Sequence, residues 1–323
     1  MDRKLVADIF HPLLQHIYGR KGVLKALREL EITQWYSPAE MRELQLAKLK
    51  SLVDYAYERI PYYRRRFDER SLRPSDIELL EDVSKLPKLT KADIKENLSS
   101  MVDPSFEGKL IKNTTSGSTG HPIVFYEDGE KNRDCVAEYL RAIRWFGLDA
   151  GAGEARFSRL TSEVCNGNKM NLLRKILLNQ LILPGMGLSE EVFEDSFQKL
   201  VRFRPRILFG ITSALYMFTQ YILEKRKSLE NINLDLIVAW AAPLYAHQRE
   251  LMEATYDCPV LSLYGTREVG HIAAECPQKG FHINQENLLV ELVDPISGNP
   301  CRANEPGTVL VTTLNRYCMP FIR

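Results

Sequence analysis

Short apolar segments alternate with helix-patterned segments through the middle of this chain, and this alternation constrains the fold more than any other feature. The compact apolar runs cover residues 206–209, 234–240 and 259–264. Helical spacing of apolar residues covers 189–203, 213–227 and 245–256. Buried parallel strands have this near-continuous apolar character, and strands that alternate with helices indicate an α/β fold. We therefore expect layered sheets flanked by helices.

The two ends of the chain differ from this core. Ser37 and Glu40 flank Pro38-Ala39 and offer a capping box with a proline in the first helical turn. After residue 286 short strands alternate with Pro/Gly-rich turns, which indicates a small antiparallel or barrel-like subdomain. The predicted organisation is a helical region at 1–85, an α/β core at 86–285 and the start of a β-barrel-like subdomain at 286–323.

The charge balance narrows the functional classes. The chain has 43 Lys and Arg against 42 Asp and Glu in 323 residues, whereas nucleic-acid-binding proteins usually carry a basic excess. Its apolar runs are shorter than the roughly 20 residues that cross a bilayer. The cysteines form no CxxC pair, which favours reduced thiols in a cytoplasmic protein. We expect no nucleic-acid partner and no membrane span.

A run of small hydroxyl residues and glycines stands at 114–122, with the sequence TTSGSTGHP. Glycines let a backbone approach a ligand closely, and consecutive amides can hold anionic oxygens. A Walker-type P-loop needs lysine after the last glycine, where this chain has His121. Because β-prone residues flank the loop, we expect it to join two strands. Composition alone leaves an anion cradle and a flexible turn as equal alternatives.

Two further motifs follow predicted strands, and ligands collect at the carboxyl ends of strands in open α/β sheets. In the first, Tyr264 could stack on a nucleobase and Glu268 could hold Mg²⁺, which prefers oxygen ligands. In the second, the small residues of Ala241-Ala242-Pro243 leave room for a flat ligand. Taken alone, Tyr264-Gly265 is an ordinary turn and Glu268 an ordinary surface acid. Close packing of a strand end is the preferred interpretation of the second motif.

Four residues have side chains that commonly bind zinc: Cys258, His271, Cys276 and His282. Their spacing matches no standard zinc pattern, so packing or pocket lining is the preferred interpretation and zinc the alternative. No GxSxG motif for a nucleophilic serine is present.

Taken in order, the motifs resemble the ANL adenylate-forming superfamily, and within it the phenylacetate–CoA ligase-like branch that includes CapK-type proteins. The similar segments are AYERIPYYRRRF, LPKLTKAD, TSGSTGHP, YGTREVGHIAAECPQKGFHI, VELVDPISGNP, EPGTVLVTTL and MPFIR. Together they cover nearly the whole chain.

The resemblance implies that ATP adenylates a carboxylic acid and that coenzyme A then displaces AMP. It implies catalytic roles for Thr119, Arg267 and Glu268, with Glu268 as the Mg²⁺ ligand. The implied nucleotide-binding residues are Thr115, Ser116, Gly117, Ser118, Thr119, Gly120, Ala241, Ala242, Pro243, Tyr264, Gly265 and Thr266. The residues expected near the acid are Tyr126, Trp145, Phe209, Ile211 and Ala241, whose side chains suit a planar or apolar acid.

The sequence departs from the family pattern at three places. Arg267 stands where the family has Ser or Thr, and Ala242 where the branch often has an acid. The chain stops at Arg323, before a Tyr-x-Thr-Gly-Asp motif and a small C-terminal domain, so we expect a truncated large domain that adenylates poorly alone. Acyl transfer to an amine in a natural-product or capsule pathway, and a non-catalytic binding module, stay open as alternative functions. A homodimer also stays open.

Overall fold

The computed structural model describes residues 9, 11, 13, 21–106, 110–115, 122–161 and 169–323. These form two compact units. The sheet unit contains the described residues of 1–24, 136–266 and 271–282. The hairpin unit contains those of 25–135, 267–270 and 283–323.

The sheet unit is built around a seven-stranded sheet with the order β4-β3-β5-β6-β7-β8-β9. The strands are β3 (Glu154–Ser158), β4 (Gln180–Pro184), β5 (Ile207–Ile211), β6 (Leu236–Trp240), β7 (Val260–Thr266), β8 (Gly270–Glu275) and β9 (Phe281–Ile283). Strands β4, β3, β5, β6 and β7 pair in parallel. This parallel pairing confirms the predicted α/β class, and the three apolar runs are β5, β6 and β7.

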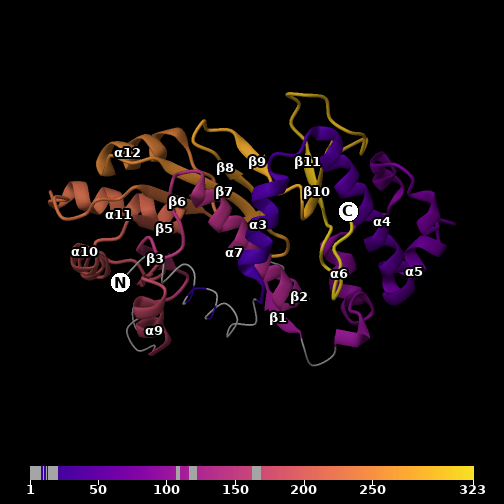
Figure 1. Ribbon diagram of the computed structural model, residues 1–323, viewed down its shortest axis with the longest axis horizontal. Helices are drawn as coiled ribbons and strands as arrows, with labels where there is room; N and C mark the ends of the chain where they lie inside the picture. The colour runs from indigo at the N-terminus through magenta and orange to yellow at the C-terminus, as the bar shows by residue number, and fades with distance from the viewer. Residues whose placement is uncertain are drawn as a thin grey trace. The chain divides into compact units, whose positions relative to one another are not determined.

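Helices pack on this sheet, and the three predicted to alternate with the apolar runs are all present. The helices are α7 (Gly129–Arg144), α9 (Lys169–Leu177), α10 (Glu190–Phe203), α11 (Thr212–Glu224) and α12 (Ala246–Tyr256). Figure 1 shows α10, α11 and α12 along the sheet. Their apolar residues, among them Phe197, Phe218 and Met252, share one buried core with Phe157 and Ile237 of the strands. This burial of apolar surface is the main stabilising contribution in the unit.

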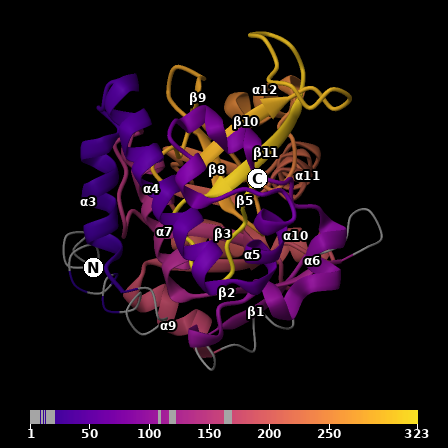
Figure 2. The same cartoon turned by 90° about the vertical axis from the view of Figure 1, so that its right-hand side faces the viewer.

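The hairpin unit combines helices with two antiparallel strand pairs. Its α-helices are α3 (Val23–Thr33), α4 (Pro38–Arg59), α5 (Pro61–Asp68), α6 (Lys91–Asn97) and the start of α7. Short 3₁₀ helices cover Pro74–Asp76, Leu80–Lys85, Leu98–Met101 and Pro104–Phe106. The strand pairs are β1 (Ile111–Thr114) with β2 (Val124–Glu127), and β10 (Leu288–Val293) with β11 (Thr308–Thr313). Figure 2 shows β10 and β11 with α4 beside them.

Local signals explain where the helices of this unit begin. Ser37 Oγ accepts from the Glu40 N–H, and the Glu40 carboxylate accepts from the Ser37 N–H, which completes the predicted capping box. Pro61 lies just past the end of α4 and begins α5. Tyr62 and Tyr63 of α5 are buried.

The predicted antiparallel strands after residue 286 are confirmed as β10 and β11. In the described part of the chain they form a separate two-stranded sheet. The carbonyl of Leu288 in β10 accepts a hydrogen bond from Gln45 of α4 at 3.0 Å. The division at residues 85 and 286 stays a prediction.

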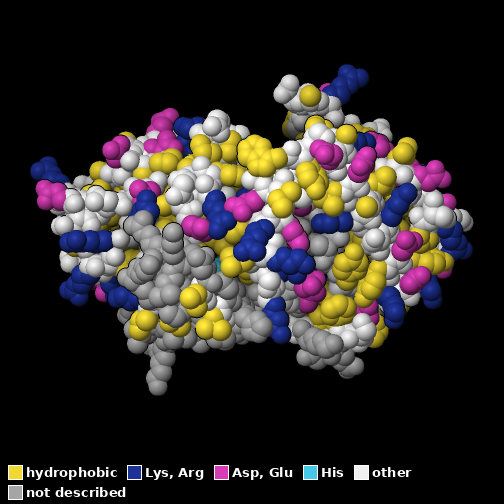
Figure 3. Space-filling model, in the orientation of Figure 1, with side chains coloured by type: hydrophobic (Ala, Val, Ile, Leu, Met, Phe, Trp, Pro, Cys, Tyr) yellow, Lys and Arg dark blue, Asp and Glu magenta, His cyan; other side chains and the backbone are white. Residues whose placement is uncertain are grey.

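Two surface properties complete the description. Figure 3 shows basic and acidic side chains mixed over the viewed face, in keeping with the nearly neutral chain. No described helix combines the length and the apolar character that crossing a membrane requires.

Candidate functional site

The β1–β2 hairpin carries the predicted phosphate loop at its tip, which confirms that the loop joins two strands. Thr114 pairs with Val124 as the last pair of the ladder. One residue further on, the Thr115 N–H donates to the Ile123 carbonyl, and Thr115 Oγ1 accepts from the Ile123 N–H, both at 3.0 Å. The side chain of Thr115 therefore closes the hairpin. Ser116, Gly117, Ser118, Thr119 and Gly120 lie outside the described residues.

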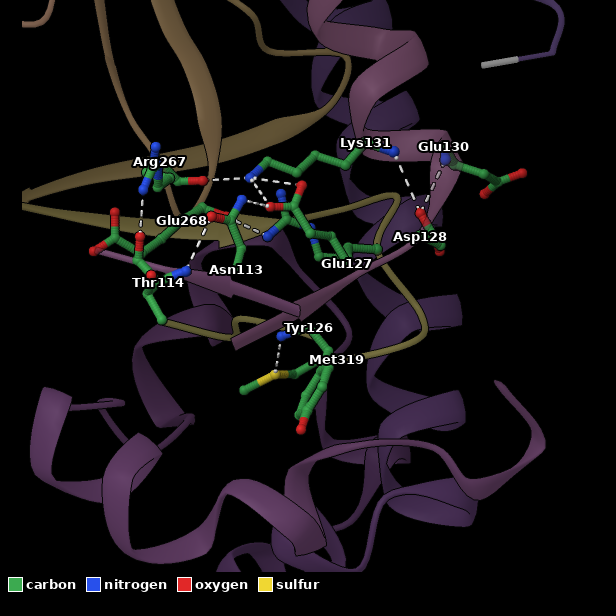
Figure 4. Close-up of polar contacts among 11 residues, drawn as sticks. Asn113, Thr114, Tyr126, Glu127, Asp128, Glu130, Lys131, Arg267, Glu268 and Met319 are labelled. Carbon is green, nitrogen blue, oxygen red and sulfur yellow. Dashed lines mark hydrogen bonds and ion pairs between the residues drawn. The ribbon is translucent and has the colours of Figure 1, made fainter. Parts of the chain in front are cut away.

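Arg267 and Glu268 lie at the base of this loop, in the same unit. The Arg267 guanidinium donates to the carbonyl of Thr114. Figure 4 shows Thr114, Arg267 and Glu268 beside one another. Within the described part of the chain, the Glu268 carboxylate has neither a hydrogen-bond nor an ion-pair partner. A half-buried, unpaired carboxylate beside the predicted anion-binding loop has the donor chemistry that Mg²⁺ prefers, so the residue fits the predicted ligand role.

Two buried cations hold the backbone of this segment. Lys131 of α7 donates to the Arg267 carbonyl, and Arg316 donates to the Glu268 carbonyl. Lys131 Nζ also lies 3.1 Å from a carboxylate oxygen of Glu127, the last residue of β2. Glu127 in turn accepts from the side-chain amide of Asn113 in β1. The network therefore ties the Arg267–Glu268 segment to the hairpin that carries the loop (Figure 4).

The second group of predicted nucleotide-binding residues lies in the sheet unit. Ala241, Ala242 and Pro243 directly follow β6, and Tyr264, Gly265 and Thr266 end β7. These strands are parallel neighbours, so both groups lie at the carboxyl edge of one sheet, where ligands bind in such folds. Tyr264 is 45% exposed, which leaves its ring available for stacking. The Ala242 carbonyl accepts from Thr212 Oγ1 at 3.1 Å, which fixes the small-residue turn.

Three of the residues predicted near the acid, Phe209, Ile211 and Ala241, lie at the ends of β5 and β6. Phe209 and Ile211 of β5 face the same side of the sheet, because strand side chains alternate. The Phe209 ring lies 5.8 Å from that of Trp240, the residue before Ala241. These four positions place an aromatic and aliphatic surface at the ends of β5 and β6.

The two remaining residues predicted near the acid have the following contacts, and their role stays a prediction. Trp145 follows α7 and packs on His282, with 5.3 Å between ring centroids. Tyr126 belongs to β2 of the hairpin unit, where it lies against the apolar core and donates its N–H to the sulfur of Met319.

The residues considered for zinc are dispersed. Among the described residues, Cys258, Cys276 and His282 belong to no group of ligand atoms close enough to share an ion. Burial raises the pKa of Cys258 to about 12, which opposes the thiolate form that zinc needs. His271 Nδ1 lies 3.8 Å from the buried Glu138 carboxylate, and His282 packs on Trp145. The geometry favours packing over a zinc site for this group.

Sequence reasoning missed three residues that the structure singles out. Lys131 and Arg316 occur in no motif, because their role depends on contacts with distant backbone. The third is Trp240, whose indole Nε1 is buried and has no hydrogen-bond partner in the described part of the chain. Its position directly before Ala241 was the one available signal.

Comparisons with known proteins identify the relatives of this chain. No protein-family model matches it. A phenylacetate–coenzyme A ligase of Aromatoleum evansii is 28% identical over 308 residues, which cover 91% of this chain and 67% of the relative. Protein CapK of Staphylococcus aureus is 25% identical over 284 residues, which cover 86% of this chain and 62% of CapK. The chain is therefore similar to phenylacetate–coenzyme A ligases and to CapK.

A solved structure agrees with this similarity at the level of the fold. The open conformation of 2-hydroxyisobutyryl-CoA ligase, in complex with 2-HIB-AMP and CoA, superimposes with a TM-score of 0.73 at 21% identity. The match covers 88% of this chain and 68% of the other. The chain spans about two thirds of the length of the relatives it matches.

Proposed function

We propose that the protein uses ATP to adenylate a carboxylic acid and then passes the acyl group to coenzyme A. The observation that carries this proposal is the similarity, across 91% of the chain, to a phenylacetate–coenzyme A ligase. The unpaired Glu268 carboxylate and the Arg267 guanidinium at the base of the 114–122 loop support it.

The proposed reaction proceeds in two steps. An oxygen of the substrate carboxylate attacks the α-phosphorus of ATP, and the bond to the β-phosphate oxygen breaks, which gives acyl-AMP and pyrophosphate. The sulfur of coenzyme A then attacks the acyl carbon, the bond to AMP breaks, and the thiol proton leaves to solvent. Both steps need positioning and charge stabilisation more than a protein nucleophile.

The residues have distinct proposed roles. The loop at 114–122 would hold the terminal phosphates, and Arg267 would stabilise charge near them. Glu268 would hold Mg²⁺, which supplies neutralisation of phosphate charge when bound. In the sheet unit, Ala241–Pro243 would border the adenine and Tyr264 would stack on its face. Stacking of a base on an aromatic ring contributes about 1–3 kcal/mol.

The acid is proposed to be aryl or apolar. Phe209, Ile211 and Trp240 form an aromatic and aliphatic surface at the carboxyl ends of β5 and β6, beside Ala241. Such surfaces line pockets for apolar ligands. We further propose that the protein works in the cytoplasm, where ATP and coenzyme A are available.

Acid-dependent exchange of labelled pyrophosphate into ATP tests the first step. A panel of aryl, alkyl and hydroxy acids should give exchange with at least one aryl or apolar member. Because the large domain is expected to adenylate poorly alone, the assay uses the full-length protein, and absence of exchange with every acid would then favour a binding module instead. Addition of coenzyme A or of candidate amines then separates thioester formation from amide formation.

A further inference from the structure

Two buried cations donate hydrogen bonds to the backbone of the Arg267–Glu268 segment. Lys131 and Arg316 donate to the carbonyls of Arg267 and Glu268, which are consecutive along the chain. The side chain of Lys131 is 8% exposed and Arg316 is 4% exposed. Burial of a cation costs free energy unless partners compensate it. Two such cations on one short segment therefore indicate a specific requirement for its geometry.

Nearby carboxylates and an aromatic ring partly offset the burial of both cations. Glu127 forms an ion pair with Lys131. Burial, and then the nearby charge of Arg316, lower the pKa of Lys131, while Glu127 opposes that shift. Burial also lowers the pKa of Arg316, and the charges of Glu127 and Asp128 oppose it. The Arg316 guanidinium lies 5.3 Å from the Phe321 ring, a further favourable contact for a cation.

The orientation of these peptides determines where two proposed functional side chains point. With its carbonyl held by Lys131, Arg267 directs its guanidinium to the Thr114 carbonyl at the base of the loop. With its carbonyl held by Arg316, Glu268 leaves its carboxylate unpaired on the same side (Figure 4). A rotation of either peptide would move these groups away from the loop.

We infer that Lys131 and Arg316 are positioning residues for nucleotide binding. They fix the Arg267–Glu268 backbone, so that Glu268 can meet a metal-bound triphosphate and Arg267 can brace the loop. The proposed role requires neither side chain to touch the nucleotide. The inference rests on the proposed function, because it explains the geometry of the Arg267–Glu268 backbone by ATP binding.

The test is a calorimetric titration with ATP, in Mg²⁺ and separately in EDTA, of the wild type, Lys131→Met and Arg316→Met. Loss of a hydrogen bond to a charged group corresponds to about a tenfold change in affinity. We expect each variant to lose about that factor in Mg²⁺ and distinctly less in EDTA. A merely structural role would lower both affinities alike.

Lys48→Met is the matched control. Lys48 lies in the same unit, burial lowers its pKa, and its Nζ donates to the carbonyl of Glu286 at 2.7 Å. It therefore shares the chemistry of Lys131 but holds a different segment. We expect its ATP affinity to equal that of the wild type. A loss as large as that of Lys131→Met would overturn the inference.

The outcomes separate this inference from the proposed function. Wild-type protein that does not bind Mg-ATP overturns both. Wild-type binding with unchanged affinity in Lys131→Met and Arg316→Met overturns the positioning role alone. If a methionine variant does not fold, Lys131→Arg and Arg316→Lys retain a buried cation with altered donor geometry. A smaller loss of ATP affinity that occurs only in Mg²⁺ supports the positioning role in these variants. An unchanged ATP affinity contradicts it.

Discussion

Substitution of Gly270 by alanine should destabilise the hairpin unit through two separate effects. Gly270 follows the Arg267–Glu268 segment closely and has φ +91. A left-handed backbone conformation costs a residue with a Cβ about 1–2 kcal/mol. The added Cβ would also lie 2.6 Å from the sulfur of Cys135 in α7, and such overpacking costs about 1–3 kcal/mol. The expected loss is about 2–5 kcal/mol in the free energy of unfolding.

A double-mutant cycle with Cys135→Ala separates the two effects. Removal of the sulfur relieves the steric conflict but leaves the backbone strain, so the coupling free energy should be about 1–3 kcal/mol. Urea unfolding at 25 °C of the wild type, both single variants and the double variant gives all four values. If Gly270→Ala loses less than about 0.5 kcal/mol, or if the two substitutions are additive, the assigned contact between Gly270 and Cys135 is wrong.

Two further predictions concern the buried core. Tyr63→Phe removes the hydroxyl that donates to the Pro320 carbonyl at 2.8 Å and accepts from the Ile322 N–H, and urea unfolding should show a loss of about 2 kcal/mol or more; an unchanged midpoint would contradict this. Burial raises the pKa of Cys258 and of Cys318 to about 12, so both thiols stay protonated at pH 8. Iodoacetamide at pH 8, read by peptide mass spectrometry, should spare them until urea is added, and rapid labelling of the folded protein would refute the assigned burial.

Local sequence signals predicted the helix starts and the parallel strands. Ser37 caps α4 with the expected reciprocal bonds, and Thr90 caps α6 in the same way, because a cap depends only on residues three positions apart. The apolar runs of β5 and β6 were recognisable because both faces of a central parallel strand are buried. β8 lacked such a run, since its sequence GHIAAE mixes polar and small residues.

The arrangement around the loop could be predicted only in part. The motifs pointed to Arg267 and Glu268, but the residues that hold them are remote in sequence. Lys131 and Arg267 are 136 positions apart, and Arg316 lies 48 positions beyond Glu268. A hydrogen bond from a side chain to a backbone carbonyl cannot be predicted from the residue type of its partner, because every residue has a carbonyl. Only the tertiary contacts show that Lys131 and Arg316 hold the Arg267–Glu268 backbone.

Adenylation is the central proposal, and the fate of the substrate's carboxylate oxygen tests it most directly. The protein is given an aryl acid labelled with heavy oxygen in its carboxylate, together with ATP, Mg²⁺ and coenzyme A. Attack of the carboxylate on the α-phosphorus, followed by thioester formation, predicts one labelled oxygen in AMP and none in pyrophosphate. Label in inorganic phosphate would indicate an acyl-phosphate route and contradict the account, and so would thioester formed with unlabelled AMP.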